Sequence, residues 1–152
     1  MGTNRASERY MVGEYALTIC KILDLADIRL IFSSEKMQTK SMMACADVEN
    51  GIVYVRPKMK ENLDTRFAVA HELRHIWQFR TDKEKYFANY KTAEELDLET
   101  YNLQAAEVDA NAFSVIVMVD LYGIKPTFDN LPKEIRAIIY QKADEIAENL
   151  QN

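Results

Sequence analysis

The first part of the chain combines one helical pattern with a run of strand-forming residues. Apolar residues recur at three- and four-residue spacing over residues 8–26, which predicts a helix whose buried face carries Leu17 and Ile22. Residues 28–34 are rich in β-branched and aromatic side chains, and this composition predicts a short strand. We therefore expect a helix followed by a strand at the start of the chain.

Two further runs flank a turn signal and predict a β-hairpin. Residues 42–47 and 52–56 lie on either side of Asn50-Gly51, a pair that favours the positive φ angles of a tight turn. Pro57 lacks the amide hydrogen needed to continue a strand ladder, so it closes the second strand. Together with the preceding strand, the hairpin predicts a small antiparallel sheet.

The second half of the chain is helical in pattern apart from one polar stretch. A helix begins near Asp64, a plausible N-cap, and the polar, tyrosine-bearing residues 81–91 predict a loop. A long helix over residues 97–122 ends at Gly123, and a last amphipathic helix begins near Pro132. The apolar stripes of these two helices comprise Leu103, Ala106, Ala110, Phe113, Val117 and Leu121 in the first, and Ile135, Ile138, Ile139, Ile146 and Leu150 in the second.

The order of one helix, three strands and three helices predicts an α+β fold, with a small antiparallel sheet packed on helices. The chain has 152 residues, of which 48% are hydrophobic and 28% charged, as in ordinary globular proteins and unlike disordered ones. We find no linker, repeat or low-complexity segment. The sequence therefore predicts a single domain spanning residues 1–152.

Charge and hydropathy exclude two classes of partner. The net charge is −5 and no basic patch offsets it, so we expect no direct contact with nucleic acid. No segment reaches the roughly 18 uninterrupted apolar residues of a membrane span, and the N-terminus lacks the apolar core of a signal peptide. The two cysteines, Cys20 and Cys45, are expected to stay reduced. These features predict a soluble cytoplasmic protein, whose oligomeric state they leave open.

Both histidines of the chain lie in the segment His71-Glu72-Leu73-Arg74-His75, within a predicted helix. Residues four apart on a helix lie one above the other, so the two imidazoles can converge on one metal ion. Glu72 points about 100° around the helix, beside such an ion, where it can act as a base on water. Chance produces this H-E-x-x-H pattern about once in a thousand such chains. Two surface histidines that bind nothing are therefore the weaker interpretation.

A catalytic zinc ion needs a third protein ligand and an open position for water. No histidine remains, so the ligand is a carboxylate or a cysteine, and neither cysteine has a supporting motif. Glu107 and Asp109 lie on opposite edges of the apolar stripe of the long predicted helix. Helical geometry alone does not choose between these two acids, and either could be an ordinary solvated residue.

Two motifs in the chain resemble the ImmA/IrrE family of small zinc metallopeptidases. The segment His71–His75 matches the family pattern H-E-L-G-H, and Glu107–Phe113 matches the later pattern E-x-E-A-N-x-F. The strand at residues 52–55 is similar to the family's strand ahead of the active-site helix, and the resemblance covers residues 28–120. It implies a minimal, gluzincin-like zincin domain built around the H-E-x-x-H helix.

The resemblance also implies roles for individual residues. His71, His75 and Glu107 would bind one zinc ion per chain, Glu72 would be the catalytic base, and Asn111 could orient a ligand. Family members are intracellular regulators, often of phages and mobile elements, that cut a repressor protein. The implied function is a zinc metalloendopeptidase acting on an intracellular protein, plausibly a transcriptional repressor.

The chain departs from the family pattern at three places. Arg74 replaces a glycine and could pair with Asp109, contact substrate or be solvated, whereas Ser114 replaces an alanine. After Phe113 the family's Leu-Met-Pro ending is absent, which affects the end of that helix. None of these changes touches the expected ligands.

Two other functions remain alongside the peptidase: a non-catalytic zincin-like binding module, and an acidic scaffold protein without metal, which would require the histidine spacing to be accidental. A zincin-like module that binds and regulates a partner without cleaving it would need no Glu72, so the complete motif argues against it.

Trp77 is expected to pack in the core. The aromatic residues Tyr86, Phe87 and Tyr90 of the predicted loop either bury one another or supply a phenol to the site.

Overall fold

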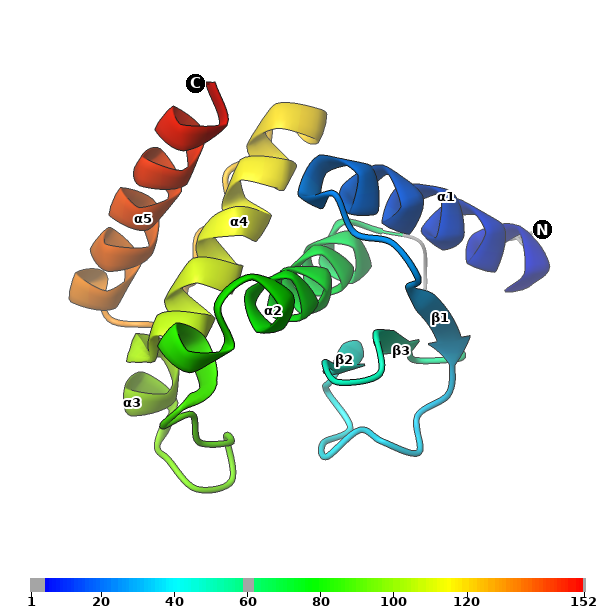
Figure 1. Ribbon diagram of the computed structural model, residues 1–152, viewed down its shortest axis with the longest axis horizontal. Coiled ribbons are helices and arrows are strands. Elements are labelled where there is room, and N and C mark those ends of the chain that lie inside the picture. The colour runs from blue at the N-terminus through cyan, green and yellow to red at the C-terminus, as the bar shows by residue number, and fades with distance from the viewer. Residues whose placement is uncertain (1–4, 59–61, 152) are drawn as a thin grey trace. The chain divides into compact units, whose positions relative to one another are not determined.

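The computed structural model describes residues 5–58 and 62–151 (Figure 1). The chain divides into two compact units, Met1–Trp77 (unit 1) and Gln78–Asn152 (unit 2). The organisation as one domain, expected from the sequence, stays a prediction.

Unit 1 contains a helix and a small sheet, followed by the first part of a second helix. These elements are α1 (Arg5–Leu23), β1 (Arg29–Phe32), β2 (Ala44–Asp47), β3 (Ile52–Val55) and α2 (Leu63–Phe87), the last of which continues into unit 2. The hairpin strands are slightly shorter than predicted, and the turn residue Gly51 has the expected positive φ of 66°.

The sheet has the strand order β1-β3-β2 and is mixed. The β2–β3 pair is the predicted antiparallel hairpin, but β1 runs parallel to β3, with Arg29 opposite Ile52. The expectation of a wholly antiparallel sheet was therefore wrong for β1. Side chains alternate between the two faces of a strand whether its neighbour runs parallel or antiparallel, so the pattern does not reveal the direction of pairing. Parallel pairing of β1 and β3 requires a crossover connection, and the long segment between β1 and β2 allows it.

The buried face of α1 differs from the predicted one. Val12 and Ile19 are buried, whereas Leu17 is 56% exposed and Ile22 is 43% exposed. The helix carries two apolar stripes, and periodicity cannot tell which one packs against the rest of the unit. It also ends earlier than predicted, because Asp24 adopts a left-handed conformation with a φ of 54°.

The helix α2 begins and continues differently from the prediction. Its N-terminus is capped by Asn62, whose Oδ1 accepts a hydrogen bond of 3.0 Å from the amide of Thr65, and not by Asp64. The helix runs to Phe87 with a single break at Asp82, so the loop predicted at residues 81–91 is helical over its first part. Asp82 Oδ1 accepts a hydrogen bond from the amide of Lys85 at 3.1 Å, as an N-cap does, and this restarts the helix after the break.

Unit 2 consists of the end of α2 and three helices, α3 (Leu98–Leu103), α4 (Ala105–Tyr122) and α5 (Lys133–Gln151). The predicted helix at residues 97–122 is thus two helices, because Gln104 adopts an extended conformation between them. The helix α4 ends at Gly123, which is left-handed with a φ of 66°, as predicted.

The core of unit 2 forms where α4 and α5 pack side by side (Figure 1). Its buried residues are Ala112, Val115, Leu131, Ile135, Ile139, Ala143 and Ile146. The predicted stripes extend beyond this contact, since Leu103, Leu121, Ile138 and Leu150 are exposed. The apolar run over residues 113–119 is buried over most of its length, but Val119 at its end is 42% exposed.

The architecture is α+β, with a small three-stranded sheet and helices, and is consistent with a minimal zincin-like domain. The H-E-x-x-H segment lies in α2, as the spacing predicted. Within the described part of the chain, every helix is too short or too polar to cross a membrane.

Candidate metal centre

The two histidines of unit 1 face each other across one turn of α2. His75 is buried and His71 is partly buried, and their Nε2 atoms are 3.1 Å apart. The ring centroids lie 4.7 Å apart with an interplanar angle of 86°. The side chain of Phe67, one turn earlier, stacks on His71 with ring centroids 6.3 Å apart. Helical spacing thus brings together the two histidines that the sequence analysis singled out.

The separation of the two nitrogens allows a test of whether the pair fits zinc. Two nitrogens bound tetrahedrally at about 2.0–2.1 Å from zinc lie roughly 3.3 Å apart. The observed separation of 3.1 Å between His71 and His75 is close to that value. The pair therefore fits a tetrahedral ion without rearrangement of the helix.

Glu72 lies beside the histidine pair. Its Oε2 is 3.9 Å from His71 Nε2, and 17% of its side chain is exposed. Burial raises the pKa of the Cys45 thiol on β2, and the negative charge of Glu72 raises it further. This electrostatic effect indicates that Cys45 lies within electrostatic range of the carboxylate of Glu72.

Arg74 occupies the position that is glycine in the ImmA/IrrE pattern, and it is not solvated. The residue is buried, and its guanidinium carbon lies 3.6 Å from the ring centroid of Trp77. Stacking of a guanidinium on an indole is a favourable cation–π contact. Trp77 packs against this arginine but is only half-buried, so it is not the core residue that the sequence predicted.

Glu107 lies in the first turn of α4, in unit 2, and is almost fully buried at 2% exposure. The hydroxyl of Tyr90 donates a hydrogen bond of 2.8 Å to Glu107 Oε2. Burial and the negative charge of Glu107 raise the pKa of Tyr90 well above its ordinary value, so the phenol keeps its proton and remains a donor.

Asp109, the other candidate acid, has a different partner. Its Oδ2 accepts a hydrogen bond of 2.8 Å from Gln78 Nε2, which also donates to the carbonyl of Ala106 at 2.9 Å. Both Asp109 and Gln78 are buried. This carboxylate thus satisfies an amide within unit 2. Asn111, which the resemblance suggested as an orienting residue, donates a hydrogen bond of 3.3 Å to Asn102 Oδ1.

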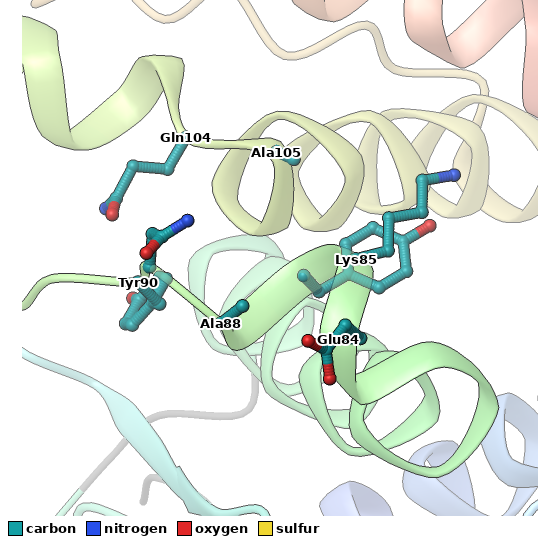
Figure 2. Close-up of a pocket in the computed structure, with 8 residues that line it drawn as sticks. Glu84, Lys85, Ala88, Tyr90, Gln104 and Ala105 are labelled. Atoms are coloured by element: carbon teal, nitrogen blue, oxygen red, sulfur yellow. The ribbon is translucent and has the colours of Figure 1, made fainter.

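A pocket of about 250 Å³ lies next to Tyr90 in unit 2 (Figure 2). It is lined by Glu84, Lys85, Tyr86, Ala88, Asn89, Tyr90, Gln104 and Ala105. Tyr90 was expected among the aromatic residues of a loop, but its contact with Glu107 was not predicted. Gln78 and Tyr101 were also missed. These residues carry no motif, and only the folded chain brings them to their partners.

A helix that presents H-E-x-x-H with converging imidazoles is the hallmark of metal-dependent peptidases. The chain belongs to the family described as "Putative metallopeptidase family (DUF6782)", whose model matches residues 26–123. This match contains the H-E-x-x-H segment and Glu107, and it names a metallopeptidase family without naming ImmA/IrrE. No curated protein and no solved structure matches the chain.

Proposed function

We propose that the chain is a zinc metallopeptidase that hydrolyses a peptide bond in an intracellular protein, as the resemblance to the ImmA/IrrE family implies. The observation that carries this proposal is the 3.1 Å separation of the Nε2 atoms of His71 and His75 on the H-E-x-x-H helix. Membership of a metallopeptidase family supports it independently.

The proposed zinc ligands are His71, His75 and Glu107. In support, each of these side chains offers one ligand atom, an imidazole nitrogen or a carboxylate oxygen. Two imidazole nitrogens and one carboxylate oxygen form a donor set known from catalytic zinc sites, which keep a fourth position open. Gln78 lies one helical turn beyond His75 and binds the backbone of Ala106, the residue before Glu107, which gives further support.

Glu72 is the proposed base. When bound, zinc acts as a Lewis acid and lowers the pKa of a coordinated water to about 7. Glu72 lies beside the histidines, where it accepts a proton from the attacking water and then donates it to the departing amine. Its position adjacent to His71 in sequence, about 100° around the helix, keeps its carboxylate available for this proton transfer.

The substrate backbone is proposed to bind along β2. This strand pairs with β3 on one side only in the described sheet, so its other edge can accept an extended peptide. The electrostatic effect of Glu72 on Cys45 supports the choice of β2, because it requires the strand to lie near the base. A repressor of a phage or mobile element, carried on a separate chain, is the substrate class that the family resemblance suggests.

The experiment compares the zinc-loaded wild type with Glu72→Gln. The readouts are zinc stoichiometry by mass spectrometry and cleavage of a proteome-derived peptide library. We expect the variant to keep one zinc ion and its fold but to cleave about 10²–10⁴-fold more slowly, the usual contribution of a general acid–base group. Glu84→Gln, the same change at an exposed position of α2, serves as the matched control and should match the wild type.

Two results would contradict the proposal. Loss of zinc from Glu72→Gln would make Glu72 a ligand and not a base. No cleavage by the zinc-loaded wild type, together with stable and intact binding of a co-purified partner, would favour the non-catalytic binding module.

A further inference from the structure

The buried carboxylate of Glu107 is contacted by a pair of phenols within unit 2. The Tyr90 hydroxyl lies 2.8 Å from Glu107 Oε2 and 3.1 Å from the hydroxyl of Tyr101. An ionised carboxylate can only accept hydrogen bonds, so the single hydrogen of Tyr90 serves Glu107. The hydroxyl of Tyr101 lies within hydrogen-bond distance of the same Tyr90 oxygen. The two phenols and the carboxylate are thus linked through the Tyr90 hydroxyl.

The backbone that carries Tyr90 is fixed by a second set of hydrogen bonds. The amide of Lys91 donates to Gln104 Oε1 at 2.7 Å, and Gln104 Nε2 donates to the carbonyl of Lys91 at 2.9 Å. Figure 2 shows the Gln104 side chain extending from the start of α4 toward the segment that carries Tyr90. Since Glu107 lies in the first turn of the same helix, the donor and the acceptor are both held from α4.

The ring of Tyr90 is held from its other sides by aromatic contacts. It packs edge-on against Phe87 with ring centroids 5.4 Å apart, and its centroid lies 6.3 Å from that of Tyr101. A phenol held in this way has little freedom to rotate away from the carboxylate. The side chain of Tyr90 therefore loses its conformational entropy during folding and not when Glu107 binds a ligand.

We propose that Tyr90 is a positioning residue for Glu107, which fixes the carboxylate in the orientation that binds the metal, and that Tyr101 holds Tyr90 in place. This inference rests on the proposed function, in which Glu107 is the third zinc ligand. Residues that hydrogen-bond to metal ligands orient them, and their loss typically lowers metal affinity by roughly 10–100-fold. Tyr90 itself contacts neither the metal nor the reacting atoms in this proposal.

The test measures zinc affinity by competition with a chromophoric chelator for the wild type, Tyr90→Phe and Tyr101→Phe. We expect Tyr90→Phe to weaken zinc binding by roughly 10–100-fold, and Tyr101→Phe to weaken it less, because the hydrogen bond to Glu107 remains. Tyr140→Phe is the matched control, since it removes a phenol hydrogen bond of 2.6 Å to the carbonyl of Pro126 within the same unit. It should leave zinc affinity unchanged.

A double-mutant cycle distinguishes positioning from a general structural role. In a Glu107→Ala background, adding Tyr90→Phe should change zinc affinity by no more than about twofold, because the group on which Tyr90 acts is gone. Cobalt-loaded Tyr90→Phe should also show an altered visible absorption spectrum, whereas Tyr140→Phe should not. An equal loss of affinity from Tyr90→Phe in both backgrounds would overturn the proposal.

The failures of this inference and of the proposed function have different signatures. If Glu107→Ala weakens zinc binding and Tyr90→Phe leaves it unchanged, the positioning role is wrong and the ligand set stands. If Glu107→Ala itself leaves zinc affinity unchanged, the proposed ligand set is wrong, and the inference falls with it. If Tyr90→Phe does not fold, the zinc affinity of Tyr101→Phe tests the proposal instead. Weaker zinc binding in Tyr101→Phe would support the positioning role, and zinc affinity equal to that of the wild type would contradict it.

Discussion

At the scale of single residues, Glu107 and Asp109 show how two buried acids of one helix acquire different environments. They are two positions apart on α4, at 2% and 1% exposure. Asp109 accepts a hydrogen bond from the Gln78 amide, whereas Glu107 accepts one from a phenol. The hydrogen bond to Asp109 stabilises the fold of unit 2 directly, because it satisfies the buried side-chain amide of Gln78. The same amide also donates to the carbonyl of Ala106.

We predict opposite outcomes for alanine substitutions at these two acids. Glu107→Ala should sharply reduce zinc stoichiometry, because a proposed ligand is removed. Asp109→Ala should keep one zinc ion per chain but lower the free energy of unfolding by about 1–3 kcal/mol, the usual cost of leaving a buried polar group unsatisfied. Metal analysis and urea unfolding of both variants measure the two effects. An empty site in Asp109→Ala with a full site in Glu107→Ala would reverse the ligand assignment.

At the scale of elements, the ends of helices follow from local chemistry that the chain carries at each boundary. The helix α4 ends at Gly123, whose amide donates to the carbonyl of Val119 at 2.9 Å, while the amide of Ile124 donates to the carbonyl of Met118 at 3.2 Å. These bonds satisfy carbonyls that the helix leaves without partners, and they require a left-handed residue after its last turn. Glycine adopts this conformation without the steric cost that a side chain brings.

Two glycine-to-alanine substitutions should therefore change stability in opposite directions. Gly123→Ala should destabilise by roughly 1–2 kcal/mol, because an L-residue is strained at its φ of 66° even though no atom lies within 4 Å of the added methyl group. Gly13→Ala, within α1 and with equal space around it, should stabilise by about 0.5–1 kcal/mol. Urea denaturation measures the free energy of unfolding of both variants. A loss of stability in Gly13→Ala would contradict the explanation that alanine is favoured over glycine within this helix.

At the scale of the whole molecule, metal binding and stability are linked. A metal that binds the native chain and not the unfolded one stabilises the native state according to its free concentration relative to its dissociation constant. Glu107 lies 32 residues beyond His75 in the sequence, so the unfolded chain does not present all three proposed ligands together. Zinc should therefore act as a stabilising ligand of the folded protein.

We predict that zinc raises the thermal midpoint and that a chelator reverses the rise. Free zinc at 100 times its dissociation constant should add about 2.7 kcal/mol to the free energy of unfolding. For a chain of this size, each kcal/mol corresponds to roughly 2–4 °C in the midpoint. Circular dichroism melts with zinc and with EDTA measure the shift. The double variant His71→Ala/His75→Ala should show no shift, and a shift equal to that of the wild type would place the zinc elsewhere.

The amino-acid sequence by itself determined the features that depend on near neighbours. The spacing of His71 and His75 on a helix predicted the converging imidazoles, and Asn50-Gly51 predicted the hairpin turn between β2 and β3. Gly123 marked the end of α4 in the same way. Each of these signals acts within about four residues, the range over which helix turns and hairpin turns close their hydrogen bonds.

The tertiary structure alone decided the pairings between distant residues. Neither the parallel pairing of β1 with β3 nor the exposure of Leu17 follows from local periodicity. The same is true of the hydrogen bond from Tyr90, which follows the end of α2, to Glu107 in α4. Such contacts form because the chain as a whole buries its apolar faces and satisfies its buried polar groups together, and many local patterns are compatible with more than one such arrangement.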